Sequence, residues 1–151
     1  MHKKTVLFFC SFNSVRSQIA EGFLNARCKD GYTAFSANIA PAGLNPYAIA
    51  VMKEAGIDIS TQKSKQLTQF TATRFDYVIT MCDRAKAAVP RSIPKGETTI
   101  HRGFVSPSDI QETKEEILGN FRALRDDIDA WLTEIFPECP KIQSERREPK
   151  K

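Results

Sequence analysis

Hydrophobic and polar positions divide the chain into segments that predict strands and helices in alternation. A continuous apolar run at 5–10 predicts a strand buried on both faces. Residues 17–28 follow with an apolar stripe, which predicts an amphipathic helix. The same kind of pattern predicts further strands at 32–39, 75–81 and 98–101, and further helices at 46–55, 65–70 and 113–136.

The last predicted helix has the most regular pattern. Six apolar residues recur at intervals of four, three, four, four and three: Ile117, Phe121, Leu124, Ile128, Leu132 and Ile135. This spacing places them on one face of a helix. We expect that face to lie on a sheet.

Strands that alternate with helices predict an α/β fold with a parallel sheet. We expect a three-layer sandwich, in which a four-stranded parallel sheet of order 2-1-3-4 has helices on both faces. In this order ligands bind at the carboxyl ends of the first and third strands. A single domain is expected over residues 1–140, followed by a polar, disordered tail at 141–151.

Composition narrows the class of protein. The 151 residues are 41% hydrophobic and 26% charged, which is ordinary for a globular domain. No apolar run approaches the roughly 20 residues of a membrane-spanning helix, and no basic stripe is interleaved with aromatic residues. We therefore expect a cytoplasmic monomer that binds neither membranes nor nucleic acid.

The four cysteines, Cys10, Cys28, Cys82 and Cys139, are too widely spaced to indicate a metal site. In a reducing compartment we expect them to be thiols and not structural disulfides. Cys28, at the end of a predicted helix, is expected to belong to the core. No bound metal or cofactor is predicted.

The most informative motif lies where the first predicted strand ends. Five residues separate Cys10 from Arg16, and a predicted helix starts directly afterwards. The backbone N–H groups of such a loop and helix N-terminus bind an oxyanion. They also lower the pKa of a thiol, so we expect Cys10 to be a thiolate. The guanidinium of Arg16 matches two oxygens of phosphate or arsenate.

The loop predicts thiolate attack on a tetrahedral oxyanion, with Cys10 as nucleophile. The candidates for substrate binding are the residues that follow it: Ser11, Phe12, Asn13, Ser14, Val15, Arg16 and Ser17. A cysteine and an arginine at this spacing also occur by chance, with the cysteine as a small buried hydrophobe. The strand before and the helix after the loop favour the catalytic interpretation.

A second cysteine is expected close to the first. Cys82 directly follows the third predicted strand, which is a neighbour of the first strand in the predicted order. Neighbouring strands lie about 5 Å apart. We therefore expect Cys10 and Cys82 to approach each other in space.

Nearly the whole chain, from residue 4 to about 136, resembles the low-molecular-weight protein tyrosine phosphatase superfamily, and within it the arsenate reductases. The residues that carry the resemblance are the Cys-x5-Arg-Ser loop with the helix start at 18–22 and the segments 45–48, 54–60, 63–64, 75–83, 101–104 and 121–126. The resemblance implies the fold expected above.

The resemblance implies one of two activities. In a reductase Cys10 attacks arsenate, and Cys82 then attacks the sulfur of Cys10, which releases arsenite and leaves a disulfide. An external thiol such as thioredoxin or glutathione restores the thiols. In a phosphatase of this type Cys10 is phosphorylated, an aspartate protonates the leaving group, and water resolves the intermediate. Cys82 would then be a buried structural residue.

Two departures from the family pattern concern turnover. Val89 occupies the place of the third cysteine of thioredoxin-coupled relatives, so an external thiol must act directly on a Cys10–Cys82 disulfide unless Cys28 or Cys139 substitutes. A second departure removes the general acid. Ser106 stands in its place, and Asp109 is a candidate substitute that is more often a turn or helix-cap residue.

A third departure concerns an ion. Some reductases of the family hold potassium beside the loop, and Asn13, Glu21 and Ser36 match three of the four ligand positions, whereas Lys65 replaces the acid. We expect the ammonium of Lys65 to take the place of the cation, so that potassium does not stimulate activity. Alternatively, Lys65 is a solvated surface residue.

Three functions remain open at this point. The first is an arsenate reductase that uses Cys10, Arg16 and Cys82. The second is a phosphatase that acts on phosphotyrosine or small phosphate esters. The third is an oxyanion-binding homologue that keeps the loop but has weak or no turnover.

Overall fold

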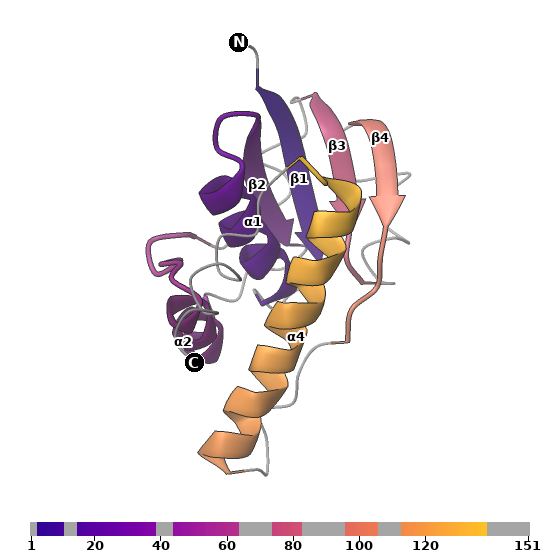
Figure 1. Ribbon diagram of the computed structural model, residues 1–151. Coiled ribbons are helices and arrows are strands. Elements are labelled where there is room, and N and C mark those ends of the chain that lie inside the picture. Colours follow the sequence, from indigo (N-terminus) through magenta and orange to yellow (C-terminus); the bar gives the residue numbers. More distant parts are fainter. Residues whose placement is uncertain are drawn as a thin grey trace.

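A computed structural model describes residues 3–10, 15–38, 44–63, 74–82, 96–105 and 113–138. Over these residues the elements follow in this order (Figure 1): β1 (Lys4–Cys10), α1 (Arg16–Arg27), β2 (Tyr32–Asn38), α2 (Pro46–Glu54), β3 (Phe75–Thr80), β4 (Gly96–His101) and α4 (Lys114–Ile135). The bounds lie within two residues of those predicted. The helix predicted at 65–70 lies outside the described residues.

The four strands form one parallel sheet of order β2-β1-β3-β4, which confirms the predicted topology. Strand β1 lies in the middle, and its residues from Val6 to Cys10 have no exposed surface. Because successive residues of a strand point to opposite faces, both faces of the sheet are covered at β1. The continuous apolar run in the sequence reflects this burial.

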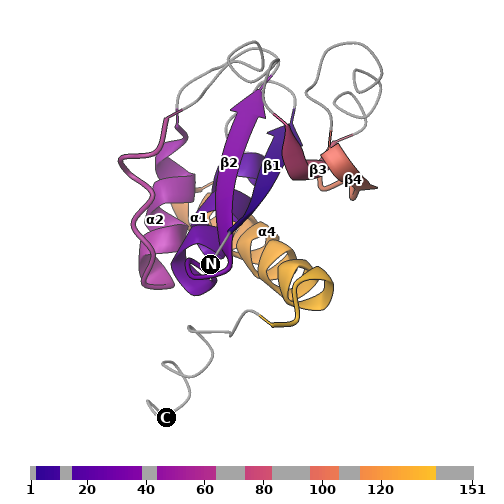
Figure 2. The same ribbon diagram turned by 90° about the horizontal axis from the view of Figure 1, so that it is seen from above.

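Helices α1 and α4 lie side by side on one face of the sheet, and α2 packs beyond them (Figures 1 and 2). Local signals fix where α2 and α4 begin. The side chain of Asn45 accepts a hydrogen bond from the N–H of Tyr47 at the start of α2, and Thr113 forms a capping box with Glu116 at the start of α4. None of the described helices is long and apolar enough to cross a membrane.

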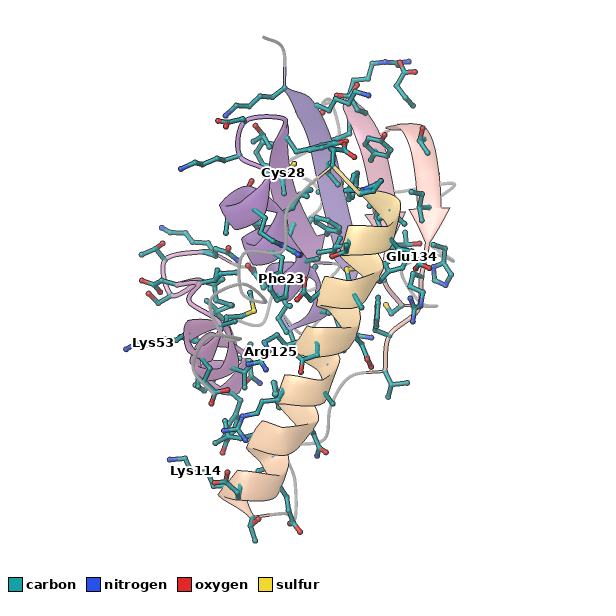
Figure 3. All side chains as sticks on the ribbon, viewed as in Figure 1. Phe23, Cys28, Lys53, Lys114, Arg125 and Glu134 are labelled. Atoms are coloured by element: carbon teal, nitrogen blue, oxygen red, sulfur yellow. The ribbon has the colours of Figure 1, made fainter. Side chains whose placement is uncertain are left out.

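Two buried side chains of α4, those of Arg125 and Trp131, lie outside the apolar stripe that the spacing predicts. Arg125 lies between α4 and α2 (Figure 3), where its Nη1 donates to the carbonyl of Val51 at 2.8 Å and to Glu54 at 3.2 Å. Trp131, 7% exposed, packs toward the end of β4. Residues outside the apolar stripe therefore also hold α4 in place, Arg125 against α2 and Trp131 against Phe104 beyond β4.

Helix α1 is buried on more than one face. Its polar residues Ser17 and Gln18 have no exposed surface, and the amide of Gln18 donates to the carbonyl of Lys63 at 2.9 Å. On the same side a Cβ added to Gly22 would lie 2.6 Å from Ile59 Cγ2. The segment after α2 therefore packs closely on the start of α1, the helix that follows the predicted oxyanion loop in the sequence.

Candidate active site

The two cysteines expected to meet lie at the carboxyl ends of adjacent strands. Cys10 is the last residue of β1, and Cys82 lies two residues beyond β3. The N–H of Met81 donates to the carbonyl of Phe9 at 2.9 Å, so strand pairing continues up to both cysteines. Both are thiols and both are buried, and the electrostatic effect of Cys82 raises the pKa of Cys10. The structure thus brings this pair together.

The buried guanidinium of Arg16 lies at the same edge of the sheet, where the strands have their carboxyl ends. Arg16 is 7% exposed, and its Nη1 donates to the carbonyl of Phe104 at 2.9 Å. Among the described residues its Nε has no hydrogen-bond partner. An unsatisfied donor on a buried cation is costly unless a ligand satisfies it, and an oxyanion meets that need.

The N-terminus of α1 adds a second source of positive potential. The helix starts at Arg16, and Val15 at the N-cap has no side chain that can cap it. No acidic residue lies in the first turn. The backbone N–H of Ser17 in the first turn donates to Cys10 Sγ and lowers its pKa, so the start of this 12-residue helix favours negative charge at this place. The Val15 side chain belongs to the core, so only its backbone is placed to contribute.

The protonation of Cys10 differs from the expectation. Burial raises the pKa of the Cys10 thiol, and the lowering by the Ser17 hydroxyl, 3.1 Å from Sγ, and by the charge of Arg16 does not offset it. The sequence pattern predicts the helix N-terminus correctly but not the complete burial of the sulfur. With the contacts that the structure describes, Cys10 therefore favours the neutral thiol, and its thiolate requires further stabilisation.

Some predicted site residues lie outside the described residues, and their roles stay predictions. In the loop these are Ser11, Phe12, Asn13 and Ser14; elsewhere they are Ser106, Asp109, Lys65, Val89 and Cys139.

Two neighbours of the site are not predicted from the sequence. One is the backbone carbonyl of Phe104, which has no signal in a side-chain pattern. The other is the pair Thr80 and His101, whose Oγ1 and Nδ1 lie 2.8 Å apart at the ends of β3 and β4. A polar residue at the carboxyl end of each strand is the signal that points to this pair.

Two of the residues matched to an ion site do meet. The Ser36 hydroxyl donates to Glu21 Oε1 at 2.5 Å, and both side chains are buried. Among the described residues no cluster of histidine, cysteine and carboxylate side chains is able to hold a metal ion.

Cys28 contradicts the expectation that all four cysteines are thiols, because it is disulfide-bonded. It ends α1 near the amino ends of the strands (Figure 3), and its carbonyl accepts from the N–H of Gly31. At this edge Tyr32 donates to Glu138, so the chain after α4 returns to the end of α1. The sequence pattern gives no sign of this return.

The distance from Cys28 to the thiol pair follows from the strand between them. The N–H of Lys4 donates to the carbonyl of Gly31, which places Cys28 at the start of β1, whereas Cys10 ends it. Six strand residues at about 3.3 Å each separate the two ends by roughly 20 Å. Cys28 therefore does not substitute for a third catalytic cysteine.

Comparison with known proteins decides the family. The model of the low molecular weight phosphotyrosine protein phosphatase family matches residues 5–147. The chain belongs to this family. Curated relatives in it are arsenate reductases: that of Bacillus subtilis (strain 168) is 39% identical over 141 residues, which cover 93% of this chain and 100% of the relative. That of Halalkalibacterium halodurans is 40% identical over 85% of this chain and 91% of the relative.

Solved structures of family members share the fold. An arsenate reductase in an oxidised state superposes with a TM-score of 0.72 at 31% identity and covers 87% of this chain and 95% of its own. An arsenate reductase in a phosphate-binding state has a TM-score of 0.68 at 27% identity, over 91% and 99%. A low molecular weight protein tyrosine phosphatase from T. tengcongensis has a TM-score of 0.68 at 25% identity, over 87% and 99%.

Proposed function

We propose that this member of the phosphatase family reduces arsenate to arsenite with Cys10 as nucleophile and Cys82 as resolving thiol. The observation that carries the proposal is the pair of buried thiols at adjacent strand ends, beside the unsatisfied Nε of Arg16. A phosphatase needs only the first of these thiols. The relatives named arsenate reductase, at about 40% identity, support the same choice.

The first step joins sulfur to arsenic. The Cys10 thiolate attacks arsenate held by Arg16 and by the N-terminus of α1, and one arsenate hydroxyl takes a proton from solvent and leaves as water. A solvent proton suffices here, because the leaving group is water and not an alkoxide or phenoxide. The replacement of the general acid by Ser106 therefore affects a reductase less than a phosphatase.

The second step reduces arsenic. The Cys82 thiolate attacks Cys10 Sγ, a disulfide forms, and the electron pair of the sulfur–arsenic bond stays on arsenic, which leaves as arsenite. The two thiols supply the two electrons. Two equivalents of an external thiol then restore both cysteines and form one external disulfide.

We propose that this external thiol, thioredoxin or glutathione, acts directly on the Cys10–Cys82 disulfide. Val89 carries no thiol, and Cys28 lies about 20 Å from Cys10, by the rise per strand residue. We further propose that the protein works in the cytoplasm as a monomer.

Steady-state assays with arsenate and with an aryl phosphate test the function, each supplied with thioredoxin and, separately, with glutathione. We expect arsenate reduction that is lost in Cys82→Ser and kept in Cys28→Ser. Aryl phosphate turnover that is indifferent to Cys82→Ser would instead establish a phosphatase. Phosphate binding without either activity would establish an oxyanion-binding protein.

A further inference from the structure

Three side chains stack against one another just beyond β4. The ring of Phe104 meets that of Trp131 edge to face, with 5.6 Å between centroids and 68° between planes. The guanidinium carbon of Arg102 lies 4.5 Å from the centroid of Phe104 and 6.0 Å from that of Trp131. We call Arg102, Phe104 and Trp131 the Trp131 stack.

A single hydrogen bond connects the Trp131 stack to Arg16, the arginine expected to bind the oxyanion. The N–H of Phe104 donates to the carbonyl of Met81 at 3.0 Å, and its own carbonyl accepts from Arg16 at 2.9 Å. The Phe104 backbone is therefore held at its N–H by the end of β3 and through its ring by α4. Its remaining polar group sets the position of the Arg16 guanidinium.

A carbonyl is a suitable partner for this arginine. A carboxylate would neutralise the guanidinium and compete with the anion, whereas a neutral carbonyl orients Nη1 and leaves the positive charge intact. A single hydrogen bond to a loop carbonyl orients the side chain only if that carbonyl is itself fixed. Edge-to-face aromatic packing and a cation above both rings supply such fixation.

We propose that Trp131 is a positioning residue of the oxyanion site, which acts through Phe104 on Arg16 and does not touch the substrate. The inference rests on the proposed function only in that the site binds a tetrahedral oxyanion. Because Arg16 also lowers the pKa of Cys10, loss of the stack raises that pKa further. A tryptophan that only fills the core is expected neither to position Arg16 nor to change the pKa of Cys10.

The test measures inorganic phosphate binding by calorimetry and the pH dependence of Cys10 alkylation by iodoacetamide, in a Cys82→Ser, Cys28→Ser, Cys139→Ser background. Trp131→Ala is expected to weaken phosphate binding about tenfold, because a displaced Arg16 makes a poorer charge-assisted hydrogen bond to the anion. It is also expected to shift the alkylation profile to higher pH. Trp131→Phe, which retains a ring, should restore both.

Two variants control for folding. Phe121→Leu alters another buried ring of α4, which packs on Tyr47 and not on Phe104, and should leave phosphate binding and the alkylation profile unchanged. Phe104→Leu keeps the carbonyl but removes the ring, so it should reproduce Trp131→Ala and serves if that variant does not fold.

Normal phosphate affinity and a normal alkylation profile in folded Trp131→Ala or Phe104→Leu would overturn the proposal, as would equal losses in Phe121→Leu. These readouts do not require arsenate turnover. If the stack variants behave as expected but no arsenate is reduced, the proposed function fails and the positioning role stands.

Discussion

The reactivity of Cys10 depends on opposing effects at a single sulfur atom. Complete burial favours the neutral thiol, while the Ser17 hydroxyl and the Arg16 charge favour the thiolate. Burial has the larger effect, so the pKa lies above the ordinary value of a thiol. Because the thiolate is the form that attacks the oxyanion, the reaction depends on the contacts with Ser17 and Arg16, which favour loss of the Cys10 proton.

Ser17→Ala tests this balance. The variant loses the hydroxyl 3.1 Å from Sγ, so the pKa of Cys10 should rise further, and turnover at neutral pH should fall about tenfold, as expected for a hydrogen bond to a charged group. Below the pKa the thiol is neutral, so alkylation of wild type should increase with pH into the alkaline range. In Ser17→Ala the same increase should occur at higher pH. An unshifted profile would show that Ser17 does not support the thiolate.

At the scale of elements, the approach of α1 to the segment after α2 fixes the surroundings of the active site. Gly22 allows this approach, because Ile59 is fully buried and has no room to move away from an added methyl group. Gly119 offers the opposite environment, since a Cβ on this residue of α4 would meet nothing within 4 Å.

The two glycines form a matched pair for urea unfolding. Gly22→Ala should lower the free energy of unfolding by about 1–3 kcal/mol, because overpacking outweighs the gain in helix propensity. Gly119→Ala should raise it by about 1 kcal/mol, because the propensity gain is uncompensated. Stabilisation by both substitutions would contradict the close packing of α1 on Ile59.

For the molecule as a whole, the sheet separates two kinds of cysteine. Cys10 and Cys82 lie at the carboxyl ends of the strands, and the disulfide-bonded Cys28 lies near their amino ends. Non-reducing peptide mapping should join Cys28 to Cys139, since the other two cysteines are thiols. Cys28→Ser should lower the melting temperature and leave arsenate turnover unchanged. A cross-link between Cys28 and Cys82, or loss of turnover in Cys28→Ser, would contradict this separation.

The alternation of strands with helices predicts a parallel sheet, and the flavodoxin-like strand order expected for it predicts the meeting of Cys10 with Cys82 at the strand ends. The sequence does not predict the carbonyl of Phe104 as partner of Arg16, because a backbone group has no side-chain signature. The raised pKa of Cys10 depends on burial that only packing determines. The disulfide of Cys28 depends on where the chain runs after its last helix.

The central claim is that Cys10 and Cys82 together supply the two electrons that reduce arsenate. The most direct measurement is a single turnover of reduced enzyme with excess arsenate and no external thiol, followed by arsenite quantification and non-reducing peptide mass spectrometry. We predict one arsenite per protein, together with a peptide that links Cys10 to Cys82, and neither product in Cys82→Ser. Absence of arsenite from the wild type, or equal arsenite from Cys82→Ser, would contradict the claim.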